Sequence, residues 1–234
     1  MGTAYRHEYK YSIHSGQAAL LEARTAAILQ RDPHVAETGN YVVKSLYFDD
    51  YQDTCFWENE DGYDLRFKFR IRYYDNNTDY IRLEKKSKQN GMTQKESCLI
   101  TKEMCQSFMA GQIPQVHEDM PQKMKKLFTE MRLTNMVPKV IVIYERRPYI
   151  YPAGNIRITF DRNIASSNDI RNFLNTNIIV RPIMQKGESL MEVKWDEVMP
   201  EHIYHHLALD KLQWTSFSKY YNCRKYDCYG GYGV

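Results

Sequence analysis

The sequence predicts an α+β protein with a β-rich core, and three observations support this prediction. Aromatic residues make up 13% of the 234 residues and 19 residues are Tyr, whose flat amphipathic rings suit half-buried strands. Several segments alternate between charged and apolar residues, which is the period of a β-strand. Other segments carry apolar residues at helical spacing. Because 43% of the residues are hydrophobic, the chain can build a core without metals or disulfides, and we expect a single domain over residues 1–234.

Each element is predicted from its period and from the residues that begin or end it. Ser15 is the expected N-cap of the first helix, which Asp32-Pro33 ends. The turns Asp75-Asn76-Asn77 and Asn90-Gly91 are expected to join three strands into hairpins. In chain order we expect a strand over 5–13, a helix from Ser15 to Asp32-Pro33, a strand over 41–48, a short helix around 54–58, hairpin strands over 65–74 and 80–86, a short strand at Lys95, two helices within 101–132 broken at 111–114, strands over 139–149, 155–162 and 189–196, and helices over 200–209 and 214–221.

The strand over 65–74 is the most informative segment, because its alternate positions are Arg66, Lys68, Arg70 and Arg72. Charges at i and i+2 on a strand lie about 7 Å apart. A like-charged neighbour at that distance costs roughly 0.6 kcal/mol in bulk water and roughly 2.4 kcal/mol at an effective dielectric of 20. Water contact explains one such face, but five or six strands show the same bias towards Arg or Lys. The planar fork of Arg favours bidentate binding of phosphate.

If these strands close into a barrel with their charged faces inward, the result is a basic tunnel that contains a few carboxylates. Glu8, Glu84 and Glu192 are suitable ligands for a hard cation such as Mg²⁺ or Mn²⁺, which would bridge phosphate oxygens. The chain has no P-loop and no kinase glycine loop. Side chains would therefore have to hold the phosphates of a nucleotide.

Eight short motifs also carry a family resemblance, and they run in order over nearly the whole chain: RHEYKY at 6–11, SLYFDD at 45–50, RFKFRIRYY at 66–74, RLEKKSKQNG at 82–91, YERRPY at 144–149, IRITFD at 156–161, LMEVKW at 190–195 and SFSKYY at 216–221. Together they resemble the VTC domain, the polyphosphate polymerase branch of the CYTH-like triphosphate tunnel metalloenzymes. The resemblance implies an antiparallel eight-stranded β tunnel barrel with a basic interior, covered outside by helices. It also implies transfer of the ATP γ-phosphate to a growing polyphosphate chain, with Mn²⁺ or Mg²⁺ as cofactor.

The resemblance further implies roles for single residues. Glu192 matches the metal carboxylate of the family, and we add Glu8 and Glu84 as metal ligands. Arg6 stands where the wider superfamily has the first Glu of Glu-x-Glu-x-Lys, which argues against a second metal and against the hydrolysis that some relatives perform. The cations expected to grip phosphate during catalysis are Lys10, Arg70, Arg72, Lys86, Lys95, Arg146, Arg157 and Lys219. The residues expected to contact substrate are Arg6, Arg66, Lys68, Arg82, Lys194 and Ser218.

These assignments change the meaning of the small net charge. The tunnel would hold thirteen cations against the carboxylates Glu8, Glu84, Asp161 and Glu192, and would thus carry +9; because the total is +3, the rest of the chain would carry −6. A nearly balanced total is therefore compatible with a basic interior inside an acidic exterior. We expect ATP and inorganic polyphosphate or phosphate as partners and no nucleic acid, since the exterior would repel a duplex.

Two other functions stay open. A metal-dependent tri- or polyphosphatase would use the same fold, with water in place of the phosphate acceptor. A non-catalytic module that binds polyphosphate or inositol phosphates would need only the cations. Glu192 separates these hypotheses, because a passive binder gains nothing from a carboxylate among phosphate-binding cations, whereas a metal enzyme requires one.

The sequence also indicates a location. No stretch approaches the roughly 18 uninterrupted apolar residues of a membrane span, and the N-terminus shows no apolar signal region. We therefore expect a cytoplasmic protein, with any export of product left to a membrane partner. The five cysteines are an odd number, so we expect reduced thiols.

Overall fold

The computed structural model describes residues 5–33, 35 and 39–229. The strands found among them are β1 (His7–His14), β2 (Gln30–Arg31), β3 (Tyr41–Asp49), β4 (Arg66–Tyr74), β5 (Asn77–Gln89), β6 (Met92–Ile100), β7 (Val137–Tyr151), β8 (Ile156–Ser167), β9 (Arg181–Pro182) and β10 (Glu188–Trp195). Eight of them form one antiparallel sheet in the order β1-β10-β8-β7-β3-β4-β5-β6. Two short strands lie outside this order: β2 pairs with β7, and β9 pairs with β8.

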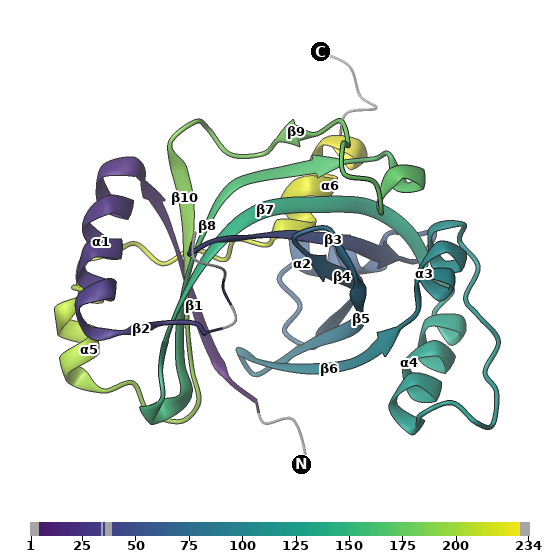
Figure 1. The fold of residues 1–234 in the computed structure, drawn as a ribbon, viewed down its shortest axis with the longest axis horizontal. Helices are drawn as coiled ribbons and strands as arrows, with labels where there is room; N and C mark the ends of the chain where they lie inside the picture. Colours follow the sequence, from purple (N-terminus) through teal and green to yellow (C-terminus); the bar gives the residue numbers. More distant parts are fainter. Residues whose placement is uncertain (1–4, 34, 36–38, 230–234) are drawn as a thin grey trace.

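The sheet curls until its two end strands, β1 and β6, approach each other (Figure 1). Arg6 and Thr93 exchange backbone hydrogen bonds of 3.0 and 3.1 Å and form the bridge between these edges. Beyond this bridge, Trp214 pairs with Tyr11, and the Thr215 N–H donates to a carbonyl of β1 at 2.9 Å. The expected eight-stranded antiparallel barrel is thus confirmed as a strongly curled sheet, closed along part of its seam by the segment around Trp214.

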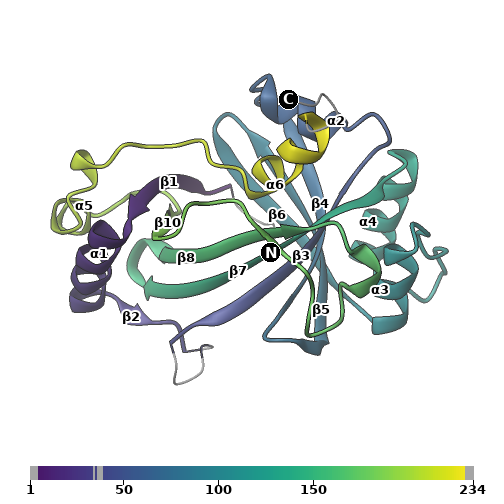
Figure 2. The same ribbon diagram turned by 90° about the horizontal axis from the view of Figure 1, so that it is seen from above.

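Most of the helices cover the outside of the curled sheet (Figures 1 and 2). Two of them, at Thr54–Glu60 and Lys219–Tyr229, also contribute side chains to the space that the sheet encloses. In the described part of the chain the helices are α1 (Ser15–Ile28), α2 (Thr54–Glu60), α3 (Lys102–Met109), α4 (Gln122–Leu133), α5 (Glu201–His206) and α6 (Lys219–Tyr229), with short 3₁₀ turns at Ala153–Asn155, Ile170–Asn172 and Leu209–Lys211. The helices α1 and α5 lie beside β1 and β10, whereas α3 and α4 lie beside β5 and β6. None of the helices in these residues is both long enough and apolar enough to span a membrane.

The apolar faces of the strands point outward and form two buried clusters under these helices. One cluster joins β4 and β5 to α3 and α4, and the other joins β1, β8 and β10 to α1 and α5. Because the apolar side chains of each strand point to the outer face of the sheet, the side chains that alternate with them must point to the inner face. Representative buried members are Phe69, Ile71, Leu83, Phe108 and Phe128 in the first cluster, and Ile13, Leu21, Phe160, Val193 and Ile203 in the second.

Both predicted hairpin turns are present. Asp75 and Asn76 have φ values of 46° and 59°, and Asn90 and Gly91 have φ values of 51° and 72°. Two successive residues with positive φ are typical of the tight turns that join twisted antiparallel strands, and Asn, Asp and Gly adopt them at the lowest steric cost. These turns fix the register of β4, β5 and β6, and with it the face on which each charged side chain lies.

Two helix starts differ from the prediction. The N-cap of α1 is His14 instead of Ser15: its Nδ1 accepts the Gln17 N–H at 3.3 Å, and the Gln17 side chain accepts the His14 N–H at 3.2 Å. The last helix begins at Lys219 instead of Trp214, because the residues before it are extended along the free edge of β1, where backbone pairing is available to them.

A buried carboxylate connects the last helix to the sheet. Asp49, at the end of β3, accepts the N–H groups of Cys55 and Phe56 at 2.9 and 3.0 Å. It also accepts the hydroxyl of Tyr220 at 2.5 Å. Asp49 therefore holds α2 and the start of α6 in place, and the residue next to Tyr220 is the predicted site residue Lys219.

Candidate functional site

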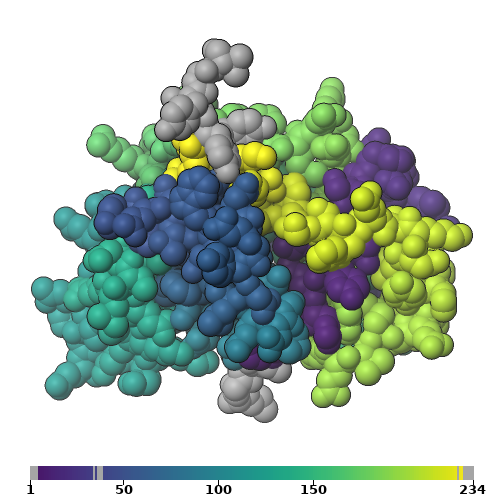
Figure 3. Space-filling view, turned by 180° about the vertical axis from the view of Figure 1, so that it is seen from behind, coloured from purple at the N-terminus to yellow at the C-terminus, as the bar shows by residue number. Residues whose placement is uncertain are grey.

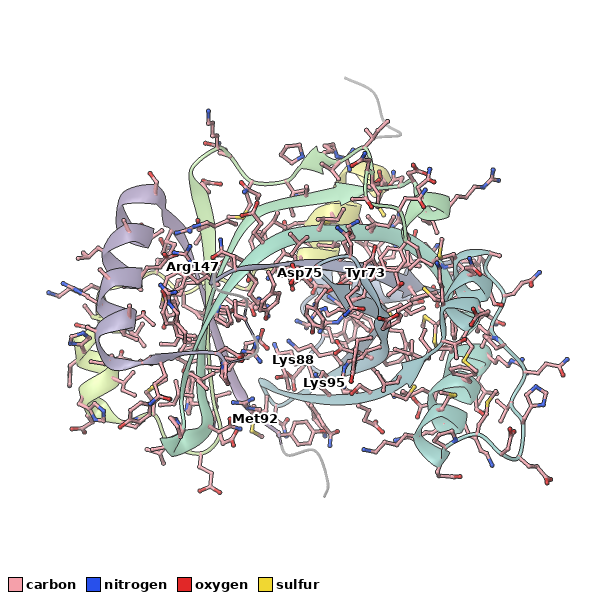
Figure 4. The ribbon with its side chains drawn as sticks, in the orientation of Figure 1. Tyr73, Asp75, Lys88, Met92, Lys95 and Arg147 are labelled. Carbon is pink, nitrogen blue, oxygen red and sulfur yellow. The ribbon has the colours of Figure 1, made fainter. Side chains whose placement is uncertain are left out.

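The strand register gathers the charged residues on the inner face. Across β4 and β5, Lys68 lies opposite Lys86 and Arg70 lies opposite Glu84. Across β1 and β10, the pairs are Glu8 with Lys194 and Lys10 with Glu192. These elements are far apart in the sequence, and the curl of the sheet turns their charged faces towards one another. Figure 4 shows Lys88 and Lys95, from β5 and β6, beside the space that the sheet encloses.

The inner face surrounds a cavity of about 370 Å³. Of the seventeen predicted site residues, twelve line it: Glu8, Lys10, Arg66, Lys68, Arg70, Arg72, Lys86, Arg146, Glu192, Lys194, Ser218 and Lys219. Side chains of this cavity range from the fully enclosed Tyr144, 1% exposed, to Tyr9 and Trp214, which are 44% and 60% exposed. The aromatic pair therefore marks its open end. Figure 3 shows that side of the molecule, where the yellow C-terminal segment lies over the purple N-terminal strand.

Glu192 lies at the centre of the first group of ion pairs. Its Oε1 is 2.7 Å from the Lys219 Nζ, and its Oε2 is 2.7 Å from the Lys194 Nζ and 3.1 Å from the Arg146 Nη2. Burial alone would raise the pKa of Glu192, but Lys194, Lys219 and Arg146 hold it well below its usual value. Asp161 adds a bidentate pair with Arg146, at 2.6 and 2.7 Å, and lies 2.6 Å from Lys219. Glu192 is therefore charged, and the two carboxylates fix these cations in place.

Glu84 organises a second group on the opposite wall. It is fully buried, and its Oε2 accepts the Arg70 Nε at 2.7 Å and lies 2.6 Å from the Arg70 Nη2. Lys95 lies 3.3 Å from the other oxygen, and Arg72 lies 3.9 Å away. Burial would raise the pKa of Glu84, but Arg70, Arg72 and Lys95 hold it well below its usual value. Arg70 cannot swing freely, since its Nη1 also donates to the Tyr47 hydroxyl at 3.0 Å.

Glu8 forms a third group, which adjoins the first. Its Oε2 lies 2.6 Å from the Lys86 Nζ, and its Oε1 lies 3.4 Å from Lys10 and 4.0 Å from Lys194. Burial would raise the pKa of Glu8, but Lys86, Lys10 and Lys194 hold it well below the usual value. Lys194 therefore bridges Glu8 and Glu192, so these two carboxylates already share one cation.

The predicted metal ligands do not form one centre. In the part of the chain that the structure describes, no group of three or more His, Cys, Asp or Glu side chains is placed to hold a metal ion. Mg²⁺ is commonly held by only one or two carboxylates together with phosphate oxygens, and Glu8 with Glu192 fits this donor set because one ammonium already sits between them. Glu84 stands apart, because none of the cations that it pairs with, Arg70, Arg72 and Lys95, is shared with Glu8 or Glu192. Its observed task is to hold Arg70.

The other five predicted residues lie outside the cavity lining. Arg157 pairs with Asp32 at 3.1 Å and donates to the Tyr41 hydroxyl at 3.1 Å. Arg6 pairs with Asp196 at 2.7 Å. Arg82 faces inward by register, opposite Arg72, and the Lys95 side chain is 53% exposed beyond Glu84. The fifth, Glu84, lies behind the lining residue Arg70.

Several lining residues were not predicted. Tyr47 and Tyr144 place their hydroxyls on Arg70 and Arg72. Lys88 was missed although it continues the spacing of 82, 84 and 86, because the strand was predicted to end at 86 whereas β5 continues to Gln89. Asn59 reaches the cavity from α2, where no strand period exists to indicate its direction.

The arrangement suits the binding and reaction of a phosphate anion. Guanidinium and ammonium groups converge on an enclosed space, and carboxylates fix their positions before a ligand arrives. Donors that are fixed in position in this way can lower the free energy of a charged transition state. Phosphoryl transfer needs this kind of positioning and charge neutralisation more than it needs a covalent protein group.

Comparisons with known proteins agree with this picture. The family model of the VTC domain matches residues 5–226. The chain is similar to the structure of a candidate adenylate cyclase from Bacillus halodurans, with 11% identity, a TM-score of 0.55, and coverage of 93% of this chain and 96% of that one. It is also similar to a candidate adenylyl cyclase from Hippeastrum that is reported to have a dominant triphosphatase activity, with 14% identity, a TM-score of 0.56, and coverage of 94% and 95%. No curated protein matches the chain. At these identities the two structures show a shared fold.

Proposed function

The chain belongs to the VTC domain family, and from this premise we propose that it is an ATP-dependent polyphosphate polymerase. A terminal oxygen of the polyphosphate chain attacks the γ-phosphorus of ATP. The bond between that phosphorus and the oxygen bridging to the β-phosphate breaks, and ADP leaves with the electron pair of that bond. The polymer grows by one phosphate.

One observation carries the proposal: the cavity is enclosed by the curled sheet, and its cations are held by carboxylates. An open groove of cations would bind any polyanion, including nucleic acid. An enclosed cavity of about 370 Å³ admits a chain of phosphates and excludes a duplex. Carboxylates such as Glu192, with pKa values held low by their neighbours, fit a site that takes a metal as well as an anion.

Different cations of the cavity have different roles in the proposed transfer. Arg70, Arg72 and Arg146 present guanidinium groups to the non-bridging oxygens and neutralise the charge that spreads over them during transfer. Lys219 contributes a compact positive charge between Asp161 and Glu192. An acceptor phosphate is already largely ionised near neutral pH, so the proposal assigns no general base and no protein nucleophile.

A divalent metal fits the proposal at one place. Glu192 and Glu8 would hold it, and when bound it would draw phosphate oxygens together and neutralise part of their charge. The identity of the ion, Mn²⁺ or Mg²⁺, is part of the proposal. Lys194 would then face the same phosphates from the next position along the inner face of β10.

A second candidate function is hydrolysis of triphosphate or polyphosphate. It is supported by the similar fold of the Hippeastrum protein, for which triphosphatase activity is reported. The same cavity would then place water where the polymerase places a phosphate oxygen. Arg6, which stands beside the seam and pairs with Asp196, leaves Glu8 without a second carboxylate two residues before it, and this favours the polymerase.

The test is incubation of the purified protein with ATP and Mn²⁺, followed by a gel stained for polyphosphate and an assay of ADP. Long polymer together with ADP supports the polymerase. Free phosphate without polymer supports the phosphatase. If neither product forms, and if Glu192→Ala leaves the affinity for polyphosphate and for Mn²⁺ unchanged, both enzymatic proposals are wrong and the cavity is a binding site only.

A further inference from the structure

The pairing of charges divides the cavity into two parts. Seven of its cations have a carboxylate oxygen within 4.0 Å: Lys10, Arg70, Arg72, Lys86, Arg146, Lys194 and Lys219. The other three, Arg66, Lys68 and Lys88, show no carboxylate within that distance among the described residues. We call these three the unpaired cations.

The unpaired cations lie together. Arg66 faces Lys88 directly across β4 and β5, and Lys68 is the next inward residue of β4. The Lys68 Nζ donates to the Asn59 Oδ1 at 2.8 Å and to the Ser218 Oγ at 2.9 Å. Both acceptors are neutral, so the hydrogen bonds orient the ammonium group without cancelling its charge. An ammonium has three donors, and one remains for a ligand.

Burial affects the pKa values of the cations in both parts. Burial, together with Arg66 and Lys10, lowers the pKa of Lys68 to about 7. Burial also lowers the pKa of Arg66, and burial with the nearby Arg66 lowers that of Lys88. In the paired part, Asp161 and Glu192 raise the pKa of Lys219 despite its burial. Burial nevertheless lowers the pKa of Lys86 to about 8, and it also lowers the pKa of Lys194, although each of these lysines faces a carboxylate. The two parts are therefore distinguished by their ion pairs: among the described residues, no carboxylate lies within 4.0 Å of the unpaired cations, whereas each cation of the paired part has one.

We propose that Arg66, Lys68 and Lys88, with Asn59 and Ser218, form an anchoring subsite for an ionised phosphoryl group. An anion that enters the paired part must break ion pairs such as Glu8 with Lys86, whereas an anion at the unpaired cations breaks none. The first phosphate therefore binds at the anchoring subsite. Six of the eight cations that the family resemblance assigns to phosphate transfer lie in the paired part, so the anchor holds a ligand that extends towards them. The inference deepens the proposed function, but it concerns binding and is measured without turnover.

The test is calorimetric titration of the metal-free protein with pyrophosphate, in the presence of a chelator and at pH 6.5. Lys88→Gln and Lys68→Gln each remove one charge from the anchoring subsite, and Kd is expected to rise at least tenfold, since a hydrogen bond to a charged group contributes about 1.5 to 3 kcal/mol. The matched control is Lys85→Gln. Lys85 lies on β5, as Lys88 does, but it faces outward, where it contacts Glu130 at 2.9 Å. The Kd of Lys85→Gln for pyrophosphate is expected to stay within about twofold of that of the unmodified protein.

The same titration with orthophosphate identifies the ligand. If orthophosphate binds and shows the same loss in Lys88→Gln, the subsite takes a single phosphate; if only pyrophosphate and longer chains respond, it takes a chain. If Lys88→Gln, Lys68→Gln and Lys85→Gln bind pyrophosphate as the unmodified protein does, the anchoring subsite does not exist. Unchanged circular dichroism and Tm exclude misfolding as the cause of a loss.

A pH series gives an independent measurement. In the free protein the ammonium of Lys68 loses its proton as the pH rises through about 7, so binding at pH 8.5 must include its reprotonation. Lys68→Arg keeps the charge, and its affinity relative to the unmodified protein is expected to rise by up to about 30-fold between pH 6 and pH 8.5. A constant ratio would contradict the role of Lys68. The titratable and charged groups that face Lys68 are Arg66 on its own strand, Lys86 on β5, Lys10 on β1, Cys55 and Glu58 on α2, and Tyr220 on α6.

The two proposals fail in different ways. If the protein makes polymer from ATP while Lys88→Gln binds pyrophosphate normally, the polymerase stands and the anchoring subsite is wrong. If Lys88→Gln loses pyrophosphate affinity but the unmodified protein yields neither polymer nor ADP, the subsite stands and the polymerase is wrong.

Discussion

Replacement of Glu84 by Gln isolates the contribution of an internal counter-ion to folding. Gln keeps the shape of the side chain but leaves Arg70, Arg72 and Lys95 without their carboxylate. Removing one partner of a buried ion pair costs about 3 to 5 kcal/mol. The lower end applies here, because the Lys95 side chain is 53% exposed and can turn its charge into water. We therefore expect the free energy of unfolding to fall by about 3 kcal/mol, and Tm to fall by roughly 6 to 12 °C for a chain of this size.

The assay is urea and thermal unfolding of Glu84→Gln in phosphate-free buffer at pH 7, with Glu130→Gln as the matched control. Glu130 also pairs with a lysine, Lys85, at 2.9 Å, but on the outer surface, where its side chain is 28% exposed. Such a surface pair contributes about 1 kcal/mol or less. Equal losses in the two variants would refute the reasoning, since burial would then make no difference. Tripolyphosphate is expected to raise Tm more in Glu84→Gln than in the unmodified protein, because its oxygens replace the missing carboxylate.

Three further outcomes are expected. The pKa values of Glu8, Glu84 and Glu192 are lowered in the folded state. Their contribution to the free energy of unfolding is therefore complete above the unfolded value, roughly pH 5, and is lost as the pH falls below about 4. Urea unfolding between pH 3 and 7 measures this loss, and a free energy of unfolding that does not change with pH would contradict it. Glu192→Gln should lower the rate of polymer formation at least a hundredfold. It should also weaken Mn²⁺ binding in the presence of tripolyphosphate, measured by electron paramagnetic resonance, and an unchanged Mn²⁺ affinity would show that Glu192 is not a metal ligand. Asp49→Asn should lower the free energy of unfolding by about 2 kcal/mol, because a buried acceptor of four hydrogen bonds gives up its charge. Chemical denaturation at pH 7 measures this, and a loss below about 0.5 kcal/mol would disprove it.

The sequence alone was sufficient to predict which face of each strand carries the charged residues. Strict alternation from Arg66 to Tyr74 placed the cations on one side, and the predicted turns at Asp75-Asn76 and Asn90-Gly91 fixed the register that brings them together. This succeeds because the period of a strand is two, so a wrong register would expose every apolar residue of the strand at once.

The pairing of the charges could not be predicted. Lys86 meets Glu8 and Lys219 meets Glu192 across separations of 78 and 27 residues, and nothing in a local pattern says which cation receives which carboxylate. The same limit applies to Asn59, which the position of α2 brings to the cavity. The helix predicted from Trp214 failed for a related reason, because a free strand edge elsewhere in the chain offered its residues backbone partners.

The ion pairs also explain how a cavity with so many cations can fold before a ligand arrives. Its ten lining cations would repel one another strongly in an enclosed space, and four carboxylates, Glu8, Glu84, Asp161 and Glu192, reduce this repulsion. On the proposed function these carboxylates have a second effect. Each phosphate that enters the paired part must replace a carboxylate as the partner of a cation, so the net gain in binding free energy per phosphate is small. A polymerase needs this balance, because a chain held by uncompensated cations along its whole length could not move on after each transfer.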